Sequence, residues 1–348
     1  MSVNPPATRR SLEPSEARNS RPANSWARRL LPLLASVREA GIVLFLAILI
    51  PLISLRQPRF FTVDNSRDIL LDIAIVSIVA VGQMMIMIAR GIDLSVGSVL
   101  GLVAMIVGLM IRDQPAFPMA VAVLVGVTLG LILGSINGLL VTKGRVPSII
   151  ATLGTLSIYR GLVIVISKGE WVDAYRVPPA FVQITRAPLF GVPALILYAL
   201  MIAGVFYYFL NFTRTGRNIY TLGSNPLAAR IAGIRSQWIT FLVFAITGTL
   251  AGLAGVLWAS RFAAVANDTG AGFELQTVAA AVIGGVNIYG GSGTVPGVLL
   301  GALLMGIIVN ALTITGISPF WRLTVQGVVI LLAVIADAVI ERRLRNVS

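Results

Sequence analysis

The sequence predicts an all-α polytopic membrane protein, a bundle of about ten transmembrane helices. Three observations carry this prediction: 57% of the 348 residues are hydrophobic, only 12% are charged, and the mean hydropathy is +0.90. Soluble proteins carry about 25% charged residues, because their surfaces have to be polar. Too few polar residues are present here to cover the two soluble domains that the length alone would suggest.

The composition also excludes most kinds of site chemistry. The chain has no cysteine and no histidine, which removes the disulfide, the thiol nucleophile, the usual general base and the usual zinc ligands. We therefore expect no catalytic residue and no metal site. The net charge of +13 would suggest a nucleic-acid partner in a soluble protein, but in a membrane protein it indicates basic cytoplasmic loops. We expect no nucleic-acid partner.

Residues 1–36 are rich in Arg, Pro, Ser and Asn, and are expected to form a disordered, basic, cytoplasmic tail. Residues 37–348 form the predicted transmembrane domain. A span needs about 20 mostly apolar residues. The eighth candidate is short and broken by glycine, which favours a half-helix or a re-entrant segment. The ten candidate spans are 37–55, 68–89, 95–111, 118–142, 147–167, 191–210, 237–260, 276–290, 297–316 and 321–340.

The positions of Lys and Arg orient the spans. With ten spans and a cytoplasmic N-terminus, the C-terminus is cytoplasmic too. Most of the 27 Lys and Arg residues then lie in cytoplasmic segments, as the positive-inside rule requires. The longest cytoplasmic connection is 211–236, and 168–190 would face outside.

Glycines recur every fourth residue in the fourth span, at Gly126, Gly130, Gly134 and Gly138. Gly248 and Gly252 repeat the spacing, as do Gly293, Gly297 and Gly301. Glycine is common in membrane helices, but four in register predict a flat stripe for close helix packing.

The segment Ala89–Ser98 interrupts the helical pattern between the second and third spans. Asp93 and Ser95 lie just before the third span. One interpretation is that Asp93 caps that helix, since its carboxylate can accept backbone N–H groups at the helix start. The other is a polar site on a solute path, because a helix break frees backbone groups for a ligand.

Polar side chains inside the spans are few, and amides and hydroxyls suit recognition of a neutral polyol. Hydrogen bonds between helices are the alternative role for each of them. Arg160 lies deep in its span and is expected to have a carbonyl or carboxylate partner. The candidate path residues are Gln83, Asp93, Ser95, Asn137, Thr152, Thr155, Arg160, Asn287 and Asn310.

The cytoplasmic segment 211–236 contains one predicted short helix. Asn225 can cap it, Pro226 suits its first turn, and Gly233 suits its end. Its small residues would let a partner protein approach closely. The alternative, an amphipathic helix resting on the membrane, needs an apolar face of Trp, Phe or Leu that is lacking. The candidate coupling residues are Gly216, Gly223, Asn225, Pro226, Ala228, Ala229, Arg230 and Gly233.

No G-x-x-x-x-G-K-[S/T] motif occurs, so the chain binds no nucleotide through a phosphate loop of that type. The glycine-rich run Gly290–Gly293 lies in an apolar context and is interpreted as a helix break.

Four segments together resemble the permease subunits of bacterial ABC importers for monosaccharides, the ribose-type group. The resemblance covers roughly residues 38–340 and rests on Gly91–Gly97, Asn137–Gly161, Gly216–Gly233 and Gly284–Gly301. Within the group, Ser157–Gly161 and Gly169–Val172 look most like the rhamnose-type and autoinducer-2-type permeases.

The resemblance implies an importer permease whose second half repeats the first with inverted topology. It implies transport of rhamnose, ribose, a similar sugar or autoinducer-2 across the inner membrane by alternating access. The implied partners are a dimer of ATP-binding subunits, a second permease subunit (identical or related), a periplasmic sugar-binding protein and membrane lipid. ATP and Mg²⁺ would be held by the ATPase, with no cofactor in this chain. Residues 224–233 would be the coupling helix.

Two other classes are weighed against this one. An ion-coupled secondary transporter could use Asp72, Asp93 or Asp337, and its transport would collapse with the ion gradient but survive loss of the ATPase. A membrane enzyme or scaffold is disfavoured by the absence of His and Cys and by the short outer loops.

Overall fold

The computed structural model describes residues 25–317 and a few isolated residues between Trp321 and Ile335. Within this part of the chain, eight helices are long and apolar enough to cross a membrane. These are α1 (Ser25–Arg56), α2 (Val63–Ile88), α3 (Val96–Asp113), α4 (Met119–Thr142), α5 (Ser148–Ser167), α7 (Ala194–Phe212), α10 (Ser236–Phe262) and α12 (Val295–Ile314).

These helices confirm the predicted polytopic bundle and correspond to eight of the ten candidate spans. The eighth candidate, 276–290, corresponds to α11 (Phe273–Ile283), an apolar helix of 11 residues, so its predicted shortness is confirmed. The tenth, 321–340, lies largely outside the described residues, as do residues 1–24 of the predicted tail. Helix α1 begins at Ser25, earlier than the predicted start of the first span.

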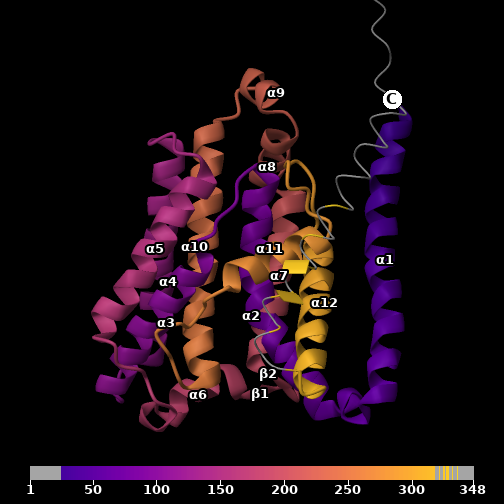
Figure 1. Cartoon of the computed structure of the whole chain (residues 1–348). Coiled ribbons are helices and arrows are strands. Elements are labelled where there is room, and N and C mark those ends of the chain that lie inside the picture. Colours follow the sequence, from indigo (N-terminus) through magenta and orange to yellow (C-terminus); the bar gives the residue numbers. More distant parts are fainter. Residues whose placement is uncertain are drawn as a thin grey trace, which may run out of the picture. The chain divides into compact units, whose positions relative to one another are not determined.

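Several short elements connect the spans. At one end of the bundle, the short helix η1 (Pro58–Phe61) connects α1 to α2. The connection from α5 to α7 at the same end contains η2 (Ala174–Arg176), α6 (Pro179–Arg186) and a hairpin formed by β1 (Pro188–Leu189) and β2 (Val192–Pro193). At the opposite end, α8 (Arg214–Ser224) and α9 (Pro226–Ile231) lie between α7 and α10. Figure 1 shows α9 projecting beyond the ends of α5 and α10.

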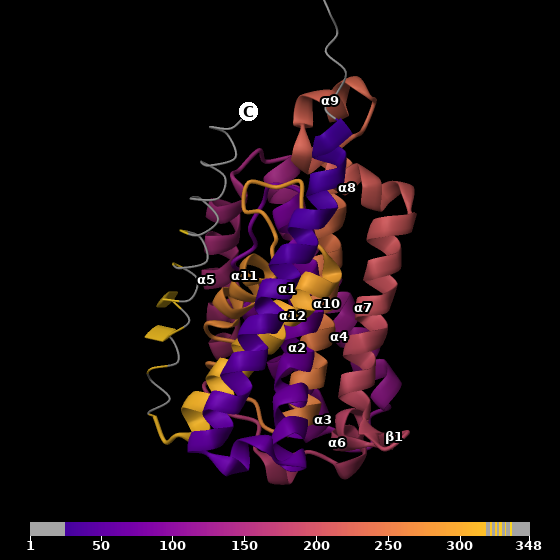
Figure 2. The ribbon, with the colours of Figure 1, turned by 90° about the vertical axis from the view of Figure 1, so that its right-hand side faces the viewer.

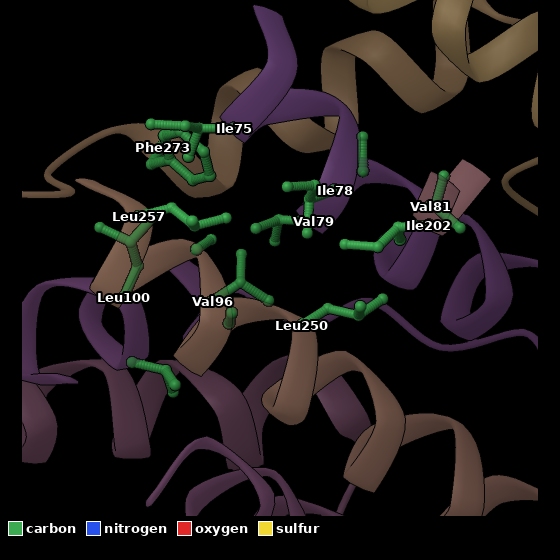
Figure 3. Packing of buried hydrophobic residues seen from close by; sticks show 14 of the residues in the cluster. Ile75, Ile78, Val79, Val81, Val96, Leu100, Ile202, Leu250, Leu257 and Phe273 are labelled. Atoms are coloured by element: carbon green, nitrogen blue, oxygen red, sulfur yellow. The ribbon is translucent and has the colours of Figure 1, made fainter. Parts of the chain in front are cut away.

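Helices α2, α3 and α10 form the centre of the bundle. In the most apolar 18-residue stretch of α2, 78% of the residues are buried inside the protein, compared with 22% in α4 and 28% in α5. Figure 3 shows Ile78 and Val79 of α2 close to Val96 of α3 and Leu250 and Leu257 of α10. The outer helices leave many large apolar side chains exposed, which is the surface expected toward lipid.

The predicted glycine stripe is confirmed as the seam between α4 and α10. A Cβ on Gly130 would collide with the backbone of Gly248 and Gly252, and one on Gly134 would collide with Gly248. The absence of side chains therefore lets the two backbones touch, which provides dispersion contacts that larger residues would prevent. A second seam joins α11 to α12, where Gly297 meets Gly284.

Two connections between helices enter the bundle from opposite ends. The α2–α3 break (residues 89–95) leads into α3, and the α10–α11 connection (residues 263–272) leads into α11. The first turn of α3 meets the α10–α11 connection at Gly97 and Gly270, where a Cβ on either glycine would collide with the carbonyl of the other. Figure 2 shows the same helices turned by 90°, with α8 and α9 again at the end opposite α6.

Candidate functional site

A group of predicted path residues lies together in the interior, where the α2–α3 break meets α2, α4 and α5. Each of these side chains is at most 1% exposed, which is deep burial for polar groups. We call the group the Asp93 cluster: Gln83, Asp93, Ser95, Asn137 and Thr152.

The carboxylate of Asp93 organises the turn before α3. Its Oδ1 atom accepts hydrogen bonds from the backbone N–H of Ser95, at 2.8 Å, and from the Ser95 hydroxyl, at 2.7 Å. The Asn137 side chain donates to the same hydroxyl oxygen at 2.7 Å. Ser95, not Asp93, is the residue at the N-cap of α3. The capping interpretation is therefore wrong in detail, because Asp93 fixes the turn that precedes the helix.

Side chains from the neighbouring helices satisfy the backbone groups that the break frees. The Gln83 amide faces the backbone of Asp93. In the amide orientation that satisfies both backbone groups, its nitrogen donates to the Asp93 carbonyl oxygen at 3.1 Å and its oxygen accepts from the Asp93 N–H at 3.2 Å. Thr152 accepts from the N–H of Leu94 at 3.1 Å. Ser148, which the sequence did not single out, accepts from the N–H of Ile92 at 3.2 Å. Such pairing is what allows irregular backbone to exist at membrane depth.

A second polar group lies where α5 meets the α10–α11 connection. The Arg160 guanidinium donates to the carbonyl oxygen of Thr269 at 2.6 Å, which confirms the expected carbonyl partner. Oε2 of Glu274 is buried without a hydrogen-bond partner among the described residues, and it lies against Gly97. We call Arg160, Thr269 and Glu274 the Arg160 group. Sequence reasoning missed Glu274, although an acidic residue in the first turn of an apolar helix was a visible signal.

The remaining candidate path residues join neither group. Thr155 donates to the carbonyl of Thr152 within α5. Asn287 accepts from the N–H of Tyr289 in the α11–α12 loop, and Asn310 of α12 donates to Asn65 of α2 at 2.9 Å. These three side chains make local or interhelical hydrogen bonds, and the proposed single path through all nine residues stays a prediction.

The predicted coupling segment contains two helices rather than one. The unpredicted α8 begins at the Thr213 cap, whose hydroxyl accepts from the N–H of Gly216 at 3.0 Å. The predicted helix is α9, in which Asn225 accepts from the N–H of Ala228 at 3.0 Å and Pro226 occupies the first turn. Gly233 follows its end with φ +76°, the conformation that favours glycine.

The exposed face of α9 differs from the predicted one. Ala229 is fully buried and so cannot present itself to a partner. Ala228 and Arg230 are exposed, and the largest exposed apolar side chains are Leu227 and Ile231, with 68% and 80% of their surfaces accessible. The exposed face of α9 therefore combines small residues with two large aliphatic side chains. A helix of six residues buries only the side that packs on the bundle.

The chain matches a protein family described as the branched-chain amino acid transport system permease component, over residues 65–334. It is 38% identical over 294 residues to the ribose import permease protein RbsC of Haemophilus influenzae, covering 84% of this chain and 90% of that one. It is 33% identical over 322 residues to the autoinducer 2 import system permease protein LsrC of Salmonella typhi, covering 91% of each. No solved structure matches.

These matches and the eight apolar helices define a multi-pass permease of the bacterial inner membrane, a transport subunit and not an enzyme. The chain belongs to the ribose-type group of ABC sugar importer permeases. The resemblance found in the sequence is thereby confirmed, while the likeness to rhamnose-type permeases stays a prediction. Within the described residues no group of three or more His, Cys, Asp or Glu side chains could hold a metal ion.

Proposed function

We propose that this chain is the transmembrane subunit of an ATP-driven importer that moves ribose, rhamnose, a similar monosaccharide or autoinducer-2 into the cytoplasm by alternating access. The observation that carries the proposal is the similarity, along nearly the whole chain, to permeases named for ribose import and for autoinducer-2 import. The two relatives leave the solute open between these chemistries.

The proposed complex contains two permease subunits (identical or related), a dimer of ATP-binding subunits and a periplasmic sugar-binding protein. Helix α9 would contact the ATPase, because it projects from the bundle and exposes Leu227 and Ile231. A pair of aliphatic side chains on a short helix suits an apolar groove on a partner. ATP and Mg²⁺ would bind to the partner, and this chain would need no cofactor of its own.

ATP-dependent uptake into vesicles tests the proposal. The vesicles contain this chain with the ATPase and binding protein encoded beside it, and labelled ribose, rhamnose and autoinducer-2 are offered separately. We expect uptake of one solute that requires ATP, requires the binding protein and survives an ionophore. Uptake that persists with an inactive ATPase but stops with the ionophore would instead favour an ion-coupled carrier.

A further inference from the structure

Three segments meet at the end of the bundle that carries α9. They are the last turn of α8 (residues 220–224), the end of α2 with the start of the α2–α3 break (residues 88–90) and the glycine-rich part of the α11–α12 loop (residues 290–293). We call this contact the α8 junction. Only Asn225 separates its first segment from α9, so a displacement of α9 reaches the junction directly.

Arg90 is the centre of the α8 junction. Its Nε atom donates to the carbonyl oxygen of Gly223 at 2.6 Å, and Nη2 donates to that of Ser224 at 3.1 Å. The last carbonyls of a helix have no partner within the helix and carry partial negative charge, so a guanidinium there is doubly favourable. Since the guanidinium is a rigid fork, the two bonds fix the direction of the end of α8 as well as its distance.

The backbone of Arg90 is held in a conformation that suits glycine better than arginine. Its φ is +68°, in the left-handed region. A non-glycine residue persists there only where its surroundings determine the conformation. A glycine at this position would relieve the strain, so stability of the turn does not explain the arginine. The side chain is the part of Arg90 that the junction uses.

The rest of the junction consists of close backbone contacts and a hydrogen bond from the Tyr220 side chain. The N–H of Gly291 donates to the carbonyl of Ile88 at 2.9 Å, and a Cβ on Gly223 would collide with that same carbonyl. The Tyr220 hydroxyl donates to the carbonyl of Gly293 at 2.8 Å. Burial raises the pKa of Tyr220 to about 12, so this hydroxyl stays protonated and remains a donor. Backbone packed against backbone leaves no flexible side chain to absorb a movement.

We propose that Arg90 is the positioning residue that transmits movement of α9 to the start of the α2–α3 break, whose far end the Asp93 cluster holds in place three residues further along the chain. This proposal rests on the proposed function, because it requires an ATPase that moves α9. In this proposal Arg90 couples two parts of the protein and contacts neither the solute nor the nucleotide.

The variant Arg90→Gly separates coupling from stability, because it removes the guanidinium and relieves the backbone strain. Arg145→Gly is its matched control. Arg145 is another arginine with positive φ, +54°, and its side chain makes no hydrogen bond among the described residues. Arg90→Lys keeps the charge without the fork. The measurement is solute taken up per ATP hydrolysed by the full complex in proteoliposomes, together with the Tm of the purified permease and its co-purification with the ATPase.

We expect Arg90→Gly to keep its Tm and its bound ATPase while uptake per ATP falls at least tenfold. Arg90→Lys should show an intermediate loss, and Arg145→Gly should match the unaltered chain. Unchanged uptake per ATP in Arg90→Gly would overturn the proposal. A fall in Tm or loss of the ATPase in that variant would overturn it too, because Arg90 would then be structural. Failure of the unaltered chain to couple uptake to ATP would contradict the proposed function instead.

Discussion

The Asp93 cluster and the Arg160 group are both polar sites among apolar helices, but they differ in burial. Members of the Asp93 cluster are at most 1% exposed, whereas Arg160 and Glu274 are only partly buried. The Asp93 carboxylate oxygen Oδ1 accepts two short hydrogen bonds. Glu274 Oε2 has none among the described residues, and within the Asp93 cluster the same holds for Asn137 Oδ1. The hydrogen-bonded groups around Asp93 and Ser95 stabilise one arrangement, because a rearrangement would leave these buried groups unpaired.

The difference indicates different roles. The Asp93 cluster ties the α2–α3 break to α2, α4 and α5 and acts as a fixed point of the bundle. The Arg160 group joins α5 to the α10–α11 connection by the charge-assisted hydrogen bond from Arg160 to Thr269. Because Arg160 is partly exposed, this bond can break and re-form without leaving a fully buried, unpaired charge. Three substitutions test this contrast, in order of expected effect, and a fourth, at Asn310, tests a hydrogen bond outside both groups.

Asp93→Ala should have the largest effect, on stability and transport together. It leaves the Ser95 N–H and hydroxyl without their acceptor, at about 1–3 kcal/mol for each unpaired buried group. We expect a clear fall in the Tm of the purified permease and loss of uptake. The control Asp64→Ala removes an exposed carboxylate from the first turn of α2, where its contribution is below about 1 kcal/mol. An unchanged Tm in Asp93→Ala would contradict the role of a fixed point.

Arg160→Gln should lower transport with little change in stability. The hydrogen bond to the Thr269 carbonyl is charge-assisted, and such bonds contribute about 1.5–3 kcal/mol. If the bond forms in only one of the two conformations of the proposed transport cycle, its loss shifts their balance by roughly 10- to 100-fold. The measurement compares uptake rate with Tm. A fall in Tm as large as that of Asp93→Ala would remove the contrast between the two sites.

Glu274→Gln should have a smaller effect than Arg160→Gln. It removes the charge of a carboxylate whose Oε2 lacks a hydrogen-bond partner among the described residues, but keeps its shape beside Gly97. We expect a change of a few-fold in uptake and an unchanged Tm. Complete loss of uptake would show that the charge itself takes part in transport, and the group would then need a different explanation.

Asn310→Ala should have the smallest effect. Its hydrogen bond to Asn65 joins the end of α12 to the start of α2 in a partly exposed place. Interhelical hydrogen bonds of this kind contribute about 0.6 kcal/mol on average in membrane proteins. Uptake within twofold of the unaltered chain is the expected result, and a tenfold loss would return Asn310 to the candidate path.

The sequence predicted the long helices well and the connections poorly. A run of about 20 apolar residues has few alternatives to a span, so α4 and α5 match their predicted ranges within a residue. Helix α8 was missed because it is short and carries Arg214, Arg217 and Asn218, so it gives no hydropathy signal. Its existence depends on the Thr213 cap and on packing against the bundle.

The sites were also predicted only where their residues stand out in the sequence, and not where the fold brings distant residues together. The Asp93 cluster could be anticipated because the break, the amides and the hydroxyls are each visible in the sequence. The bond between Arg160 and Thr269 joins residues 109 positions apart, and only the fold brings them together. The burial of Ala229 likewise depends on which side of α9 packs on its neighbours. A helix of six residues is too short to show a periodic apolar face in the sequence.

The central claim is that this permease works through an ATPase bound at α9, and the most direct test is ATP-dependent uptake by Ile231→Asp. Ile231 is 80% exposed, so an aspartate there leaves the fold intact while it places a charge on the proposed contact. Phe190→Asp, a substitution of a 99% exposed residue in the β1–β2 turn at the other end, is the control for ATPase binding. We expect Ile231→Asp to insert normally and lose at least nine-tenths of its ATP-dependent uptake. Uptake equal to that of the unaltered chain would contradict the account.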